Sequence, residues 1–152
     1  LKGIVSNYRN ITEEQKLREL NRQVSKIAKI GSWEVDIKNQ QIYWSNEVHD
    51  MHETDPNTFV PNLETAINFY REDFRELIQL SIQKCISKGE PFDLEAVLVT
   101  ANKKEIWVRA IGHADFNKNN ECTRVYGSFQ NISDIKNTEN RLYLFSENIP
   151  PY

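Results

Sequence analysis

Residues Gly127–Leu142 read GSFQNISDIKNTENRL, and a similar stretch, GIVSNYRNITEEQKLREL, stands at Gly3–Leu20. In both stretches a segment after a glycine leads into Asn-Ile-Ser or Asn-Ile-Thr, and a charged segment then ends with arginine and leucine close together. The separation of the two copies is that of a whole small domain rather than of a solenoid repeat. We therefore expect one complete domain between the two copies. Its last strand should end at the second motif, Asn-Ile-Ser, and a helix should follow that motif.

The repeat divides the chain into four expected parts. These are residues 1–12, the tail of a preceding domain of the same kind; 13–30, a connecting helix; 31–133, the complete domain; and 134–152, an exit helix and linker to the next domain. The 39% hydrophobic and 27% charged residues are ordinary for one globular domain.

Composition also limits the partners and the compartment. The net charge is −3 with acidic and basic residues interspersed, so we expect no nucleic-acid partner. No apolar run approaches the ~20 residues of a membrane span, and the N-terminus lacks the pattern of a signal peptide. We therefore expect a cytoplasmic fragment without membrane contact, in which Cys85 and Cys122 are reduced, small, buried side chains.

The order of the predicted elements indicates an α+β fold. Alternation of Trp33, Val35 and Ile37 with charged residues predicts a half-buried strand. The other expected elements are a strand at Ile42–Trp44, short helices at 45–51 and Leu63–Phe69, a long helix at Glu72–Lys88, and strands at Phe92–Thr100, Ile106–Phe116 and Thr123–Gln130. Two strands, several helices and three strands are typical of an antiparallel sheet with its helices gathered on one face.

Apolar residues recur at heptad spacing in both flanking segments. They are Leu17, Leu20, Val24 and Ile27 before the domain, and Ile135, Leu142 and Phe145 after it. One interpretation is an amphipathic helix that lies on its own domain, and the other is the seam of a parallel dimer. The N-terminal stripe is only about two heptads long, which leaves both interpretations open for that segment. The exit stripe favours a partner helix, because a monomer would leave Leu142 and Phe145 in water.

Five short motifs in this order resemble those of PAS domains from bacterial sensor proteins. They are Gly31–Asp36 (GSWEVD), Ile42–Ser45 (IYWS), Gly89–Glu95 (GEPFDLE), Ile106–Ala110 (IWVRA), and Tyr126-Gly127 with Asn131–Ser133. The resemblance implies the PAS fold, a five-stranded antiparallel sheet in the order 2-1-5-4-3 with helices over one face, here flanked by N- and C-terminal heptad helices. It also implies a small cavity between the sheet and the helices.

The same resemblance implies a function in signalling. PAS domains act as sensory or dimerising modules whose fifth strand continues into a signalling helix, which places the signal exit at Asn131, Ile132 and Ser133. The expected partners are a second copy of the chain through the flanking helices and the adjacent PAS and kinase domains of a tandem-PAS histidine kinase. Relatives usually have aspartate where Asn131 stands, so we expect that any ion pair made by that aspartate is lost here and that a hydrogen bond from the Asn131 amide replaces part of it. Ser133 is expected to cap the exit helix.

Large side chains are candidates to line the cavity that the resemblance implies. They are Trp33, Trp44, Phe59, Phe69, Phe74, Ile78, Ile82, Trp107 and Phe129. With so many large side chains, a filled core is as consistent with the sequence as an occupied pocket. Trp107 is expected to be buried, because it lies in mid-strand within the Trp-Val pair of the family.

The sequence predicts neither a catalytic site nor one of the common PAS cofactors. The segment Leu63–Phe69 lacks the cysteine of flavin-binding relatives, and Glu72–Lys88 lacks the histidine of haem-binding relatives, so a ligand would be an unknown small molecule. His49 and His52 lie one helical turn apart, a spacing that metals can use, but no further ligand is near in sequence. We therefore predict no metal site, and a solvated helix face is the alternative role of the two histidines.

Overall fold

The computed structural model describes residues 12–20, 23 and 29–138. Residues 12–20 and 133–138 are helical and flank the domain. Between them lie β1 (Ile30–Asp36), β2 (Gln41–Trp44), α2 (Asn46–His52), α3 (Leu63–Asn68), α4 (Glu72–Lys88), β3 (Phe92–Val99), β4 (Glu105–Phe116) and β5 (Cys122–Asn131). None of the helices in these described ranges is long and apolar enough to cross a membrane.

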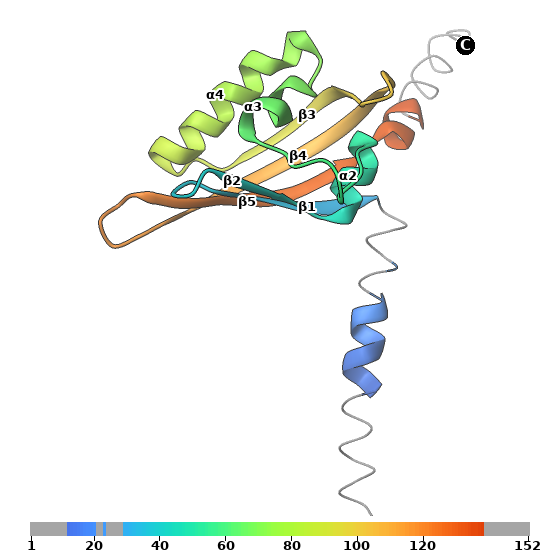
Figure 1. Cartoon of the computed structure of the whole chain (residues 1–152), viewed down its shortest axis with the longest axis horizontal. Helices are drawn as coiled ribbons and strands as arrows, with labels where there is room; N and C mark the ends of the chain where they lie inside the picture. The colour runs from blue at the N-terminus through green and yellow to red at the C-terminus, as the bar shows by residue number, and fades with distance from the viewer. Residues whose placement is uncertain (1–11, 21–22, 24–28, 139–152) are drawn as a thin grey trace, which may run out of the picture.

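The strands form one antiparallel sheet in the order β2-β1-β5-β4-β3, as the resemblance implied. Helices α2, α3 and α4 gather over one face of this sheet (Figure 1). The last strand in sequence, β5, is central and pairs along most of its length with both β1 and β4. This confirms the predicted fold class, whereas pairing of the flanking helices stays a prediction.

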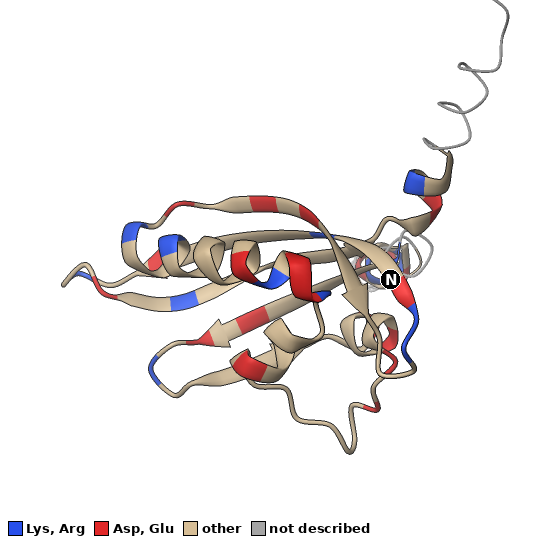
Figure 2. Cartoon of the chain, turned by 90° about the horizontal axis from the view of Figure 1, so that it is seen from above, with Lys and Arg blue, Asp and Glu red and all other residues tan. Residues whose placement is uncertain are grey.

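The long helix α4 begins and ends where its charges and its glycine predict. Glu72 and Asp73 lie in its first turn and Lys88 in its last, which complements the helix dipole (Figure 2). Gly89 follows with a φ of 70°, a left-handed conformation that glycine adopts without steric cost. The apolar stripe of the helix packs against the inner face of the sheet, where α4 contacts β3, β4 and β5.

A bulge near the start of β5 changes which side chains face inward. Asp115 pairs with Arg124 but Phe116 pairs with Cys122, so Thr123 is the extra residue of the bulged strand. The shift places Cys122 on the face of Phe116, which is the face that α4 covers. Cys85 of α4 is buried and Cys122 is half-buried.

The core lies between the inner face of the sheet and the helices. The fully buried side chains Leu98, Val108 and Val125 come from β3, β4 and β5. Trp107 lies on the opposite face, because neighbouring residues of a strand point to opposite sides and Val108 is in the core. It is half-buried against Phe74, at a ring separation of 5.9 Å, so the expectation of a buried Trp107 is wrong.

Candidate functional site

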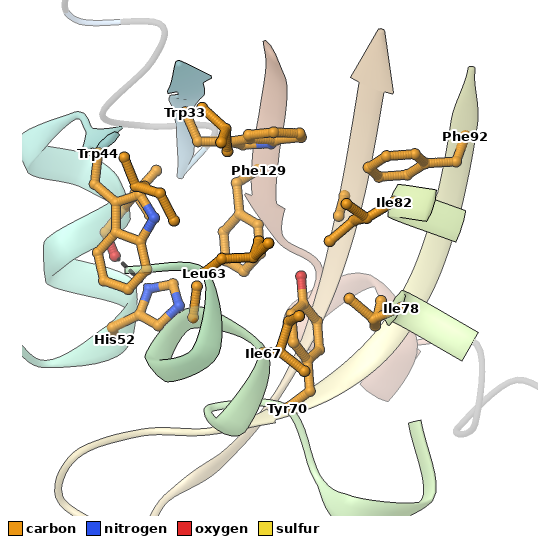
Figure 3. Close-up of a pocket in the computed structure, with 15 residues that line it drawn as sticks. Trp33, Trp44, His52, Leu63, Ile67, Tyr70, Ile78, Ile82, Phe92 and Phe129 are labelled. Carbon is orange, nitrogen blue, oxygen red and sulfur yellow. Dashed lines mark hydrogen bonds between the residues drawn. The ribbon is translucent and has the colours of Figure 1, made fainter. Parts of the chain in front are cut away.

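A cavity of about 70 Å³ lies in the core between the sheet and the helices (Figure 3). The strands contribute Trp33, Val35, Ile42, Trp44, Phe92, Ala110 and Phe129 to its wall. The helices and the segment between α3 and α4 contribute Val48, His52, Leu63, Ala66, Ile67, Tyr70, Ile78 and Ile82. All of these side chains are uncharged at neutral pH, and only His52, Tyr70 and the two indoles carry polar atoms.

Five of the nine side chains predicted for the cavity line it: Trp33, Trp44, Ile78, Ile82 and Phe129. Phe59, Phe69 and Phe74 pack against the core cluster from outside the cavity. Trp107 lies on the outer face of the sheet, away from the cavity. Whether the cavity holds a ligand stays a prediction.

The ring of His52 is held in a defined orientation between two aromatic rings. Its centroid lies 4.1 Å from that of Trp44 and 5.2 Å from that of Phe129, and both pairs are stacked. Nδ1 lies 2.7 Å from the Val48 carbonyl oxygen, which can only accept, so Nδ1 carries the proton and Nε2 is left as an acceptor. Burial lowers the pKa of His52 to about 4, so the ring is neutral at pH 7.

His49 and His52 are both buried, so the solvated helix face considered for them is wrong. His49 Nδ1 lies 2.8 Å from Thr54 Oγ1, and burial lowers the pKa of His49 as well. The described part of the chain contains no group of three or more metal-ligating side chains around them. The spacing of Val48, Met51 and His52 by three and one residues is the sequence signal that places His52 on the buried face of α2.

Tyr70 is the second polar residue at the cavity that sequence reasoning missed. It lies between α3 and α4, where its backbone bridges to Leu98 at the edge of the sheet. Its ring is buried, and burial raises the pKa of its hydroxyl well above the usual value. No periodic pattern includes Tyr70, because it lies outside the regular helices and strands, and so nothing in the sequence indicates its burial.

The end of β5 is hydrogen-bonded to the two neighbouring strands at the predicted signal exit. The Asn131 amide donates to the Lys29 carbonyl (3.1 Å), and the Ile132 amide donates to the Trp107 carbonyl (2.8 Å). Asn131 Oδ1 accepts from the Ser133 amide (3.0 Å), and Ser133 Oγ accepts from the Trp107 amide (3.0 Å). Asn131, Ile132 and Ser133 therefore connect the residue that precedes β1, strand β4 and the exit helix at one point.

The exit helix begins at this junction and is tied down by side chains. The Lys136 amide donates to the Ile132 carbonyl, so Ile132 is the N-cap and Ser133 is the first helical residue, not the cap as expected. Lys136 Nζ lies 2.8 Å from a Glu95 carboxylate oxygen and 5.0 Å from the Trp107 ring centre. These contacts hold the first turn of the exit helix against the outer face of the sheet.

The predicted dimer seam falls partly outside the described residues. Leu17, Leu20 and Ile135 are described, and all three are exposed in the single chain. Val24, Ile27, Leu142 and Phe145 lie outside the described residues. The seam therefore stays a prediction.

The purified chain is expected to show no visible absorption band of flavin or haem. The cavity of about 70 Å³ is far smaller than the roughly 300–1,000 Å³ of sites for drug-sized ligands, and the cysteine and histidine of such relatives are missing. Absorption spectra of protein expressed with and without added haem and flavin precursors test this. A band that stays with the protein through gel filtration would contradict the prediction.

Comparisons with known proteins agree with this architecture. A family described as PAS fold matches residues 41–129. A comparison with curated proteins gave no match.

Solved structures with the same arrangement come from several organisms. A sensory box histidine kinase/response regulator from Burkholderia thailandensis has a TM-score of 0.68 at 18% identity, over 83% of this chain and 94% of that one. The N-terminal domain of a diguanylate cyclase with PAS/PAC sensor from Marinobacter aquaeolei has a TM-score of 0.64 at 12% identity, over 70% and 98%. The LOV protein of Rhodobacter sphaeroides has a TM-score of 0.60 at 15% identity, over 84% and 73%. At these identities the similarity shows the fold alone.

Proposed function

Because this chain belongs to the PAS fold family, we propose that it is a sensory module of a bacterial signalling protein. In this proposal the module passes a conformational signal from its core through β5 to the C-terminal helix. One observation carries it: Phe129 lines the cavity, and the same strand reaches the exit junction two residues later. The neighbours described as sensor kinase and diguanylate cyclase support a role in signalling.

The contacts of Phe129 make β5 a suitable route for the signal. Its ring lies 5.2 Å from that of His52 and 6.5 Å from that of Tyr70, so a change in the cavity acts directly on this residue. β5 is hydrogen-bonded on both sides, and a close-packed core does not deform gradually. A shift of Phe129 is therefore passed along the strand to Asn131 rather than absorbed locally.

We further propose that the parent protein is a tandem-PAS histidine kinase that works as a cytoplasmic dimer. Residues 1–12 would end a preceding PAS domain, 31–133 form the present one, and the flanking helices 13–30 and 134–152 pair with those of a second copy. The exposed leucines Leu17 and Leu20 and the exposed Ile135 support this pairing, because a partner helix would remove them from water. We assign no catalysis to the fragment itself, and phosphotransfer would belong to domains outside it.

A relay that works without a ligand is the second candidate. The small volume of the cavity favours it, because most of the core is filled by side chains. Under this alternative the domain would join two dimer contacts and transmit force between them. A ligand-dependent rise in melting temperature, or ordered ligand density in a crystal structure, would separate a sensor from such a relay.

The Asn131→Ala variant tests the proposed route of the signal. It removes the acceptor for the Ser133 amide and should cost only ~1 kcal/mol of folding stability, the usual size of a lost capping bond. The stimulus dependence of kinase output should nevertheless fall, because the strand is uncoupled from the helix. Kinase activity of the full-length parent, measured with and without its stimulus, checks this.

Asn137→Ala is the matched control, because Asn137 is an exposed asparagine within the exit helix, after its first turn. Its regulation should equal that of the wild type. Unchanged regulation in Asn131→Ala would mean that the signal leaves by another route.

A further inference from the structure

Helix α4 carries four exposed side chains in a line along the side that faces away from the core. Asp73, Leu77, Leu80 and Lys84 follow one another at spacings of four, three and four residues, which places them on one helical face. Leu77 and Leu80 are 43% and 47% exposed, while Ile78 provides the buried contacts on the other side of the helix. The two leucines therefore face solvent in the single chain, and we call these four residues the α4 line.

The charges of α4 are divided between its two ends. Asp73 and Glu76 lie near its start, whereas Lys84 and Lys88 lie near its end (Figure 2). This arrangement complements the dipole of the helix itself. It also gives the α4 line an acidic end, an apolar middle and a basic end.

The charged groups at both ends of the α4 line are accessible. The Asp73 side chain is 59% exposed although its carboxylate also binds the Arg71 guanidinium at 2.8 Å. Lys84 is exposed and makes no ion pair with the described residues. Arg75, the other cation near the start, donates to the Tyr70 and Asn68 carbonyls and is thus turned away from the α4 line.

The α4 line is complementary to itself when a second copy of the helix runs antiparallel. Its order of acid, leucine, leucine and base is symmetric about the point midway between the two leucines. A two-fold axis through that point places Leu77 of each copy opposite Leu80 of the other. The same axis places Asp73 opposite Lys84 at both ends, whereas parallel pairing would place like charges together.

We propose that the α4 line is a contact surface for the α4 line of a second copy of this chain in antiparallel orientation. Four leucines form the centre of this contact, and two ion pairs set its register. The apolar area is small and exposed ion pairs contribute little, so the association is weak and transient. The contact is separate from the proposed seam of the flanking helices and does not depend on it.

The test exchanges the charges of the α4 line between two variants of the whole 152-residue chain. In antiparallel pairs of identical copies, Lys84→Glu creates two acidic pairs and Asp73→Lys creates two basic pairs. Each variant alone should therefore self-associate ~10-fold more weakly than the wild type. An equimolar mixture restores both pairs of opposite charge, and its association should return to the wild-type level.

Sedimentation equilibrium at low ionic strength measures these associations, because salt screens exposed charges. Lys118→Glu is the matched control, since it reverses the same charge on the exposed turn between β4 and β5, and it should associate like the wild type. Leu80→Gln changes no charge but removes two central leucines from the pair, and should also weaken association by ~10-fold. Circular dichroism verifies that each variant is folded.

An equimolar mixture that associates no better than either variant alone would overturn the proposal, because antiparallel pairing requires this rescue. If Asp73→Lys does not fold, the comparison of Lys84→Glu and Leu80→Gln with Lys118→Glu decides. Equal association of these three variants would then overturn the contact, whether the flanking helices pair or not. None of these results affects the proposed signal route, which Asn131→Ala tests in the parent protein.

Discussion

Replacing Trp44 with alanine is expected to lower the free energy of unfolding by ~3–5 kcal/mol, the usual cost of deleting a buried aromatic side chain. Trp44 is only 7% exposed and lies on β2, an edge strand that depends on its packing. Its ring centre lies within 4.1–6.0 Å of four other rings, those of His49, His52, Phe59 and Phe69. The substitution removes these contacts together and enlarges the cavity that Trp44 lines.

Urea titration at pH 7 measures this effect, and Tyr43→Ala is its control. Tyr43 is the neighbouring residue on the same strand, but it is 62% exposed and faces away from the core. Its loss should change stability by less than ~1 kcal/mol, within the range of surface substitutions and strand propensity. Similar losses for both variants would show that the strand, rather than the buried ring, determines the stability.

Stability is also expected to fall by about 3 kcal/mol as the pH is lowered from about 6.5 to about 4, through His52 alone. Burial lowers the pKa of folded His52 to about 4, whereas the unfolded chain has the ordinary value near 6.5. Between these values the unfolded state binds a proton that the folded state does not. The free energy of unfolding therefore decreases with falling pH in this window and is constant, as far as His52 is concerned, above it.

The His52→Phe variant isolates this contribution, because it keeps a ring between Trp44 and Phe129. Urea titrations of both proteins at several pH values between 4 and 7.5 should show a smaller loss in the variant. His49, whose pKa is also lowered, adds a loss of the same sign but is present in both proteins. Identical pH dependence of the two proteins would contradict the burial of a neutral His52.

The fold could be predicted because its local signals agree with one another. The helix Glu72–Lys88 has acids at its start, a glycine after its end and an apolar stripe, and the structure has the same bounds. The last three strands are bounded by asparagine-rich turns, and Asn117 Oδ1 accepts from the amides of Asn119 and Glu121 in one of them. Such signals are local, and they need no knowledge of the distant contacts.

The site could be predicted only in part. Contacts between residues far apart in sequence determine which face of a strand points into the core and how deeply a short helix is buried. Trp44 and Trp107 are both tryptophans of β-strands, yet one lines the cavity and the other lies on the outer face. The bulge at Thr123 changes the alternation of β5 without any mark in the composition. His52 was missed because histidine is a polar residue that is rarely assigned to a core from sequence alone.

The hydrogen bond between the Asn131 amide and the Lys29 carbonyl has a consequence for how such domains can be combined. The first and last residues of the domain therefore lie next to each other. The Lys29 ammonium also lies 3.4 Å from the Asp134 carboxylate. A unit whose two ends meet can be inserted into a surface loop of a host protein without separating the cut ends of that loop. The domain is therefore suited to transplantation as a single cassette, with cuts before Lys29 and after Asp134.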